Sequence, residues 1–160
     1  LRRRPRATAQ CTSCSFQQAV YLLDFLWLKV PWSTGLYNYI YDVVAPAVEA
    51  MAEVVDSLVV GQPWEEDVRV VLFVVLQEET ALEADLEQRI RQQIRTYATP
   101  RHVPARILAI PDVPRTISGK KVEKAVLQVL QGEVVENTAA LANPESLDTF
   151  RQLRDDLRNA

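Results

Sequence analysis

The sequence predicts a small α/β (α+β) domain in which about three strands form a mixed sheet with helices packed on it. The run 68–76 is apolar on both alternating faces, as expected of a central strand covered on both sides. Four apolar residues then recur at every fourth position, which predicts an amphipathic helix: Leu82, Leu86, Ile90 and Ile94. A third apolar run, 107–110, precedes a glycine-containing turn and a second helical pattern.

The first half of the domain follows from local patterns. A strand is expected over Val54–Val60, ended by Gly61 and Pro63. The amphipathic helix after the central strand is expected to stop at Thr99-Pro100. On its outer face the sequence predicts two ion pairs at i,i+4 spacing: Asp85 with Arg89, and Glu87 with Arg91.

The second half is expected to add one strand and one helix. The strand lies near Ile107–Ile110, and the helix runs from about Lys121 to Leu130 and stops near Gly132. The resulting order is strand, strand, helix, strand, helix. We predict three regions: an unassigned and partly disordered segment over 1–47, the domain over 48–150, and a charged tail over 151–160.

The unassigned segment carries few interpretable signals. Its start is rich in arginine, its apolar spacing over 16–30 predicts a helix, and a further helix is plausible over 47–54. Cys11 and Cys14 form a single Cys-x-x-Cys pair, which cannot supply four zinc ligands, so no metal site is predicted. So few cysteines suit a cytoplasmic protein.

Charge and hydropathy exclude two classes of partner. The net charge of −3 gives no reason to expect nucleic-acid binding. No apolar run reaches the roughly 20 residues that span a bilayer, so no membrane segment is expected. The only histidine, His102, has no paired nucleophile or carboxylate in its surroundings, and a structural role is favoured.

The segment Pro114-Arg115-Thr116-Ile117-Ser118-Gly119-Lys120-Lys121 carries the strongest functional signal. It brings a lysine to the start of a helix, where a cation forgoes roughly 0.3–1 kcal/mol because the helix dipole is positive there. A residue that breaks a local rule indicates a functional role. Lysine is a mobile point charge that suits a phosphate or carboxylate whose charge is changing.

This segment resembles the C-terminal lysine motif of the adenylate-forming enzymes, which include the acyl-CoA synthetases. The family pattern is Pro-Lys/Arg-Thr-x-Ser-Gly-Lys, and Lys120 occupies the position of its lysine. The resemblance implies that Lys120 is catalytic and contacts the carboxylate and phosphate as the acyl-adenylate forms. Arg91 is in the helix whose arginine approaches the CoA phosphates in similar enzymes, but a surface ion pair with Glu87 explains it equally well.

The resemblance runs from about residue 48 to residue 150. EVVDSLVVG (53–61) is similar to the strand that opens the small domain of acyl-CoA synthetases, and LANPESLDTF (141–150) is most similar to the acetoacetyl-CoA synthetase branch. The implied substrates are ATP with Mg²⁺, CoA and acetoacetate or a similar acid. None of these is expected to bind tightly to this chain alone.

No segment matches the phosphate loop of the family's large N-terminal domain, and residues 33–47 do not match its hinge. The implied partner is therefore a separate adenylation domain, without which we expect the chain to be inactive. Two alternatives stay open. One is a non-catalytic module that docks on such a domain, which exposure of Trp27, Trp32 and Trp64 would favour. The other is a different acyl-CoA synthetase branch.

Overall fold

The computed structural model describes residues 43–64, 67–98 and 100–158. Four expectations concern residues outside these ranges: the arginine-rich start, Cys11 and Cys14, the helix at 16–30, and the unmatched hinge up to residue 42. Within them, residues 43–49 form a helix, earlier than the predicted 47–54, because the chain must leave the helix before Val54 begins a strand.

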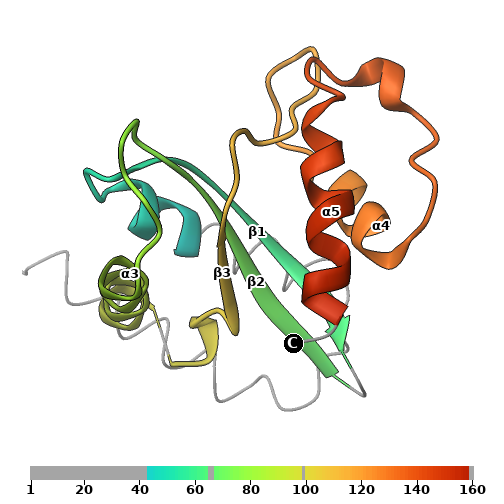
Figure 1. Cartoon of the computed structure of the whole chain (residues 1–160). Helices are drawn as coiled ribbons and strands as arrows, with labels where there is room; N and C mark the ends of the chain where they lie inside the picture. The colour runs from blue at the N-terminus through green and yellow to red at the C-terminus, as the bar shows by residue number, and fades with distance from the viewer. Residues whose placement is uncertain (1–42, 65–66, 99, 159–160) are drawn as a thin grey trace, which may run out of the picture. The chain divides into compact units, whose positions relative to one another are not determined.

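The sheet has three strands, as predicted: β1 Val54–Trp64, β2 Asp67–Leu76 and β3 Arg106–Ala109. β2 is central, antiparallel to β1 and parallel to β3, so the sheet is mixed (Figure 1). The predicted central strand is confirmed, since the run Val70–Val74 is buried throughout.

The expected end of the first strand was wrong. β1 continues through Gly61 and Pro63, and Pro63 pairs in register with Val68. A proline removes one backbone donor, which a central strand does not tolerate. β1 is at the edge of the three-stranded sheet, and there one side of the strand backbone has no strand to pair with among the described residues.

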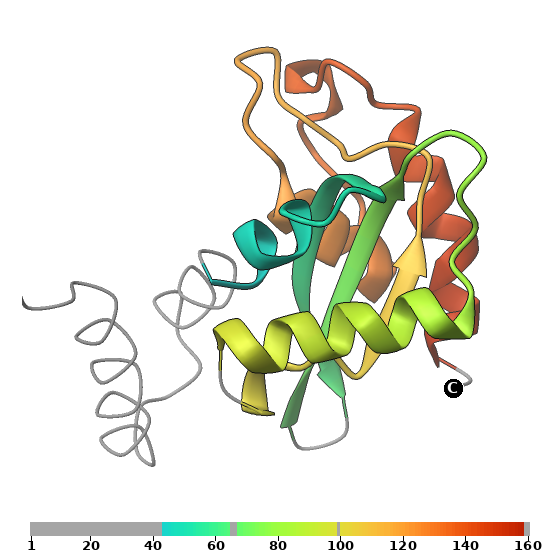
Figure 2. The same cartoon turned by 90° about the vertical axis from the view of Figure 1, so that its left-hand side faces the viewer.

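Helices lie on both sides of the sheet (Figure 2). On one side are α3 Ala84–Tyr97 and the helix 43–49, and on the other are α4 Glu123–Gln131 and α5 Ser146–Arg158. Two short 3₁₀ turns complete the described elements, η1 Pro100–His102 and η2 Thr138–Ala140. The layers agree with the predicted α/β class, and η1 carries the buried His102 that was expected to be structural.

The core between the sheet and the α4–α5 pair joins residues that are far apart in sequence. Its fully buried members come from β1, β2, the loop after β3, α4 and α5: Leu58, Val60, Val71, Phe73, Val113, Val126, Leu147 and Phe150. The rings of Phe73 and Phe150 meet edge to face with centroids 4.9 Å apart. α5 also includes residues 151–158, which were expected to be a charged tail, and Leu157 is buried in this core.

Both predicted ion pairs form on the outer face of α3. Arg89 Nε lies 3.1 Å from Asp85 Oδ2, and Arg91 Nη2 lies 2.6 Å from Glu87 Oε1. Leu86, Ile90 and Ile94 are buried as predicted. The helical period therefore determined which side of α3 faces the sheet.

Candidate active-site hairpin

Residues 115–121 form a hairpin. Arg115 pairs with Lys121 in an antiparallel bridge, and the Thr116 and Lys120 backbones are joined by a 2.8 Å hydrogen bond from Thr116 N to Lys120 O. The three residues between them turn the chain, and Gly119 takes φ +82° there. A short hairpin loop commonly needs a residue of positive φ at this position, and glycine adopts it without a Cβ clash.

The hairpin separates two adjacent lysines. The Lys120 side chain is exposed and makes no hydrogen bond or ion pair with any residue that the structure describes. Its backbone N–H is held by Thr116 Oγ1 at 3.1 Å. Lys121 is only 13% exposed, and its Nζ lies 2.7 Å from Glu49 Oε1 and 2.6 Å from Asp56 Oδ1. Of the two lysines, Lys120 is therefore the one whose side chain has no partner among the described residues, and its catalytic role stays a prediction.

α4 begins at Glu123, with Val122 as its N-cap, rather than at about Lys121. Lys120 therefore lies in the hairpin, before the first turn of the helix. The predicted conflict with the helix dipole is correspondingly weaker, because that effect is confined to the terminal turn. What marks Lys120 in the structure is an ammonium that has no partner among the described residues, on an anchored backbone.

The segment 140–143 runs beside the first strand of the hairpin and is hydrogen-bonded to it. Thr116 pairs with Leu141 in an antiparallel bridge, and Ile117 N donates to Ala140 O at 3.0 Å. Asn143 Oδ1 accepts from Arg115 N at 2.8 Å, while Asn143 Nδ2 donates to Val113 O at 3.0 Å. A segment some twenty residues further along the chain thus supports the turn that carries Lys120.

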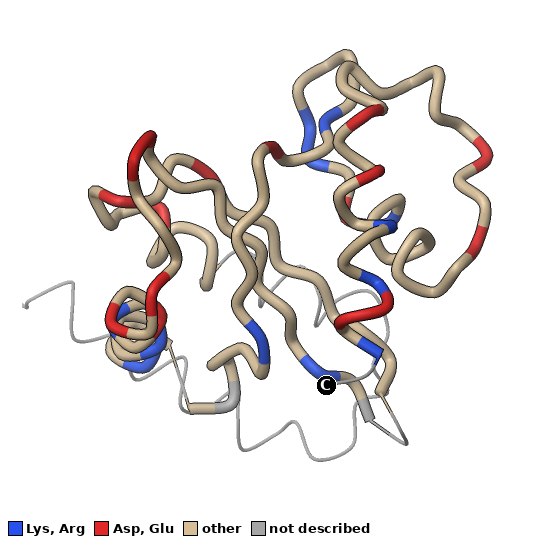
Figure 3. Tube along the Cα trace, in the orientation of Figure 1, with Lys and Arg blue, Asp and Glu red and all other residues tan. Residues whose placement is uncertain are grey.

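Asp56 holds the hairpin from the other side. Its Oδ2 accepts from Arg115 Nη2, its Oδ1 is paired with Lys121 Nζ, and it is 14% exposed. Figure 3 shows the basic residues of the hairpin as blue segments of the loop near the top of the view. The sequence analysis missed both Asp56 and Asn143. A carboxylate within a mostly apolar strand was the available signal for Asp56. Nothing local indicated the partners of Asn143.

Burial raises the pKa of the Asp56 carboxyl, but the hydrogen bond and charge of Lys121 and the hydrogen bond of Arg115 outweigh it, so the pKa lies below its ordinary value of 3.8. A lowered folded-state pKa contributes stability that is complete above the ordinary value and lost as the pH falls through the folded value. Glu49 is the other carboxylate facing these cations.

We therefore expect acid to destabilise the domain partly through Asp56. Thermal unfolding followed by circular dichroism from neutral pH to about pH 3 should show a smaller loss of stability for Asp56→Asn than for the natural chain. Glu136→Gln is the control, because it removes an exposed carboxylate that lies outside the hairpin contacts. Parallel pH curves for Asp56→Asn and the natural chain would contradict the expectation.

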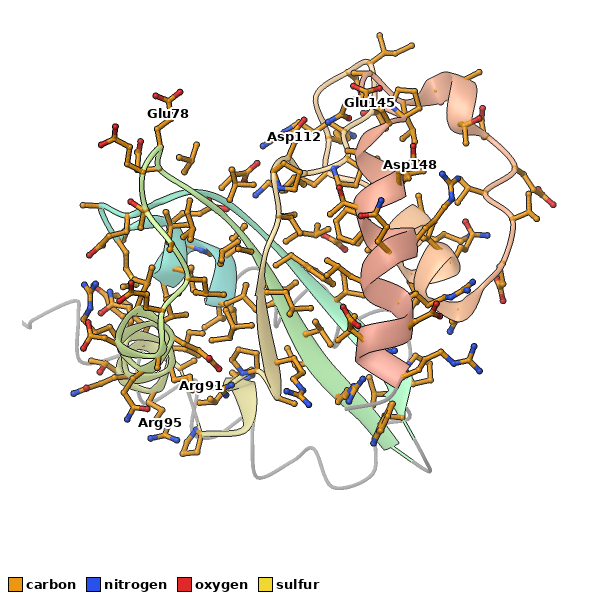
Figure 4. The ribbon with its side chains drawn as sticks, viewed as in Figure 1. Glu78, Arg91, Arg95, Asp112, Glu145 and Asp148 are labelled. Atoms are coloured by element: carbon orange, nitrogen blue, oxygen red, sulfur yellow. The ribbon has the colours of Figure 1, made fainter. Side chains whose placement is uncertain are left out.

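Arg91 lies away from the hairpin. Figure 4 labels it beside α3, at the opposite end of the sheet from Asp112 and Glu145, which flank the hairpin. Its guanidinium donates to Glu87 and to the carbonyls of Pro104 and Ala105, and its side chain is 24% exposed. These contacts tie α3 to the loop before β3, so the structural explanation of Arg91 is observed, and a role in CoA binding stays a prediction.

The described residues offer no group of three or more metal-ligating side chains. None of the helices within 43–158 that the structure describes is both long and apolar enough to cross a membrane. Trp64 is half-buried, with the Arg69 guanidinium 3.6 Å from its ring centroid. It therefore adds little to an exposed aromatic patch, and Trp27 and Trp32 lie outside the described residues.

The fold agrees with that of similar proteins. Residues 44–120 match the AMP-binding enzyme C-terminal domain family, and the match ends at Lys120. Residues 44–120 therefore form a domain of this family, which confirms the resemblance of the lysine motif. The three-stranded mixed sheet with its helices is the fold of that domain.

Within the family, the chain is most informatively compared with acetoacetyl-CoA synthetases. It is 54% identical to the acetoacetyl-coenzyme A synthetase of Rhizobium meliloti over 108 residues, which cover 68% of this chain and 17% of that protein. It is 47% identical to the Xenopus tropicalis acetoacetyl-CoA synthetase over 107 residues, which cover 66% of this chain and 16% of that protein. The structure of the Streptomyces lividans acetoacetyl-CoA synthetase matches with a TM-score of 0.66 and 31% identity. The match covers 72% of this chain and 18% of that one. The chain thus spans about a sixth of the length of these relatives.

Proposed function

We propose that this chain acts as the C-terminal domain of an acetoacetyl-CoA synthetase-like ligase. The observation that carries the proposal is Lys120 itself, which is exposed and unpaired within the part of the chain that the structure describes and lies on an anchored hairpin at the position of the family lysine. The relatives that share this region are named for acetoacetyl-CoA formation, which supports acetoacetate as the acid. A related acyl acid of another branch is the alternative substrate.

The proposed reaction has two halves. A carboxylate oxygen of acetoacetate attacks the α-phosphorus of ATP, and the bond to pyrophosphate breaks. The CoA thiolate then attacks the carbonyl carbon of the acyl-adenylate, and AMP leaves. Lys120 would bind the carboxylate and phosphate oxygens during the first half, where a preplaced cation stabilises developing negative charge. Mg²⁺ would accompany ATP in the full enzyme.

Arg91 fits the second half only as a proposal. For the guanidinium to bind a CoA phosphate, some of its bonds with Glu87 and the Pro104 and Ala105 carbonyls would have to be exchanged for phosphate oxygens. Its distance from the hairpin agrees with an enzyme in which different faces of the small domain serve the two half-reactions (Figure 4). Cytoplasmic location likewise stays a prediction.

ATP–pyrophosphate exchange with acetoacetate tests the proposal. We expect no exchange from this chain alone, because its sequence matches no phosphate loop. Exchange should appear when a separately purified large domain of an acetoacetyl-CoA synthetase is added. Circular dichroism would show that the chain is folded in the same buffer. A folded chain that restores no exchange at any ratio would favour the non-catalytic docking module instead.

A further inference from the structure

One carboxylate is bound to both strands of the hairpin that carries Lys120. Asp56 Oδ2 accepts from Arg115, on the first strand, and Asp56 Oδ1 pairs with Lys121, on the second. We propose that Asp56 is a positioning residue for Lys120, which fixes the direction in which the hairpin presents that lysine. That Asp56 fixes the hairpin rests on the geometry alone. That this affects adenylate formation rests on the proposed function.

The backbone of β1 determines where Asp56 points. The pairing register with β2 shifts between Val54 and Asp56, so that Val54 is opposite Leu76 and Asp56 is opposite Val75. Such a bulge re-aims the side chains beside it. Asp56 consequently lies on the same face as Leu58, towards the α4–α5 side, although Val54 lies on the opposite face. Ser57 N also donates to Asp56 Oδ1 at 2.8 Å, which restricts the carboxylate further.

The same contacts make Lys121 a poor substitute for Lys120. Besides Asp56, the Lys121 ammonium is bound to Glu49 and donates to Ser57 O at 2.8 Å, a backbone carbonyl of β1. Two carboxylates and a carbonyl fix this cation against the sheet. Adjacent lysines on the hairpin therefore have different tasks: Lys121 joins the hairpin to β1, and Lys120 is left available for a ligand.

The internal bonds of the turn do not require Asp56. Thr116 and Lys120 are joined by their own backbone bond, and Gly119 N donates to Thr116 O at 2.8 Å. Without Asp56 the turn would keep this shape, but Arg115 and Lys121 would lose the anion that they share, and the hairpin would pivot more freely against β1. A displacement of about 1 Å at a reacting group can cost roughly 100-fold in rate.

The experiment compares Asp56→Asn with Glu53→Gln. The control removes a carboxylate that is also ion-paired, only three residues earlier, but whose partner Arg89 is on α3. Amide hydrogen exchange of Thr116, Gly119 and Lys120 is measured in the full chain, and the two half-reactions are measured after the large domain is added. Asp56→Asn should speed exchange at these amides several-fold and slow adenylate formation roughly 10- to 100-fold, with thioester formation from supplied adenylate unchanged.

A purely structural role would lower both half-reactions together, whereas a positioning role lowers only the first. Asp56→Glu restores the charge and should recover part of the adenylation rate. If Asp56→Asn does not fold, Lys121→Gln removes the other side of the same link, keeps the bond from Arg115 Nη1 to Gly119 O, and is held to the same results. The proposal would be overturned if Asp56→Asn showed the same amide hydrogen exchange in the hairpin and the same rate of adenylate formation as Glu53→Gln.

The outcomes also separate this inference from the proposed function. Faster hairpin exchange in Asp56→Asn, together with full adenylation activity in Lys120→Ala, would retain the structural link and reject the catalytic assignment of Lys120. Unchanged amide exchange of the hairpin in Asp56→Asn, together with loss of adenylation in Lys120→Ala, would reject the structural link and retain the catalytic assignment of Lys120.

Discussion

Lys120→Ala should reduce adenylate formation roughly 100- to 1,000-fold, the cost of removing one preplaced group that stabilises developing charge. The side chain is exposed and unpaired among the described residues, so its removal leaves no buried group without a partner. The free energy of unfolding should therefore stay within about 0.5 kcal/mol of that of the natural chain. The measurement is ATP–pyrophosphate exchange with the large domain added, followed by thioester formation from supplied acyl-adenylate.

Two further variants make the result specific. Lys124→Ala removes another exposed lysine, the second residue of α4, and should leave both half-reactions unchanged. Lys120→Arg keeps the charge but replaces a compact ammonium with a larger planar group, so partial recovery of adenylation is expected. Equal losses in the two half-reactions for Lys120→Ala would contradict a role confined to adenylation.

The sequence predicted most of the fold because its signals are periodic and local. The alternation along 68–76 identified the central strand, and the four-residue spacing up to Ile94 identified α3 and its buried face. The two ion pairs on α3 followed from the same spacing. The continuation of β1 through Pro63 was missed because it depends on the position of the strand at the edge of the sheet.

The support of the hairpin could not be predicted in the same way. The lysine motif indicated Lys120, but the partners that position it come from β1 and from the segment after α4. Asp56 lies 59 residues before Arg115 in the chain, and Asn143 lies 28 residues after it. Only the packing of the sheet against α4 and α5 brings these residues together. The motif thus predicted which side chain acts, and tertiary structure was needed to show how the backbone of Lys120 is held.

Phe150→Ala is expected to have the largest effect on stability, lowering the free energy of unfolding by about 3–5 kcal/mol. The Phe150 ring is fully buried and meets Phe73 of the central strand edge to face. Truncation removes this contact and leaves a cavity between α5 and the sheet. Chemical denaturation with urea, followed by circular dichroism, would measure the loss. Arg151→Ala, an exposed neighbour on α5, should change stability by less than about 0.5 kcal/mol.

The same variant tests how far the domain extends. If residues 146–158 were a loosely attached tail, Phe150→Ala and Arg151→Ala would have similar small effects, and such a result would contradict the packing of α5. A large effect would make α5 part of the cooperative unit, although the family match ends at Lys120. Because the segment 140–143 pairs with the hairpin immediately before α5 begins, loosening α5 should also speed amide exchange at Ile117, whose N–H donates to Ala140 O. The stability of the last helix and the placement of Lys120 would then be coupled through one short stretch of backbone.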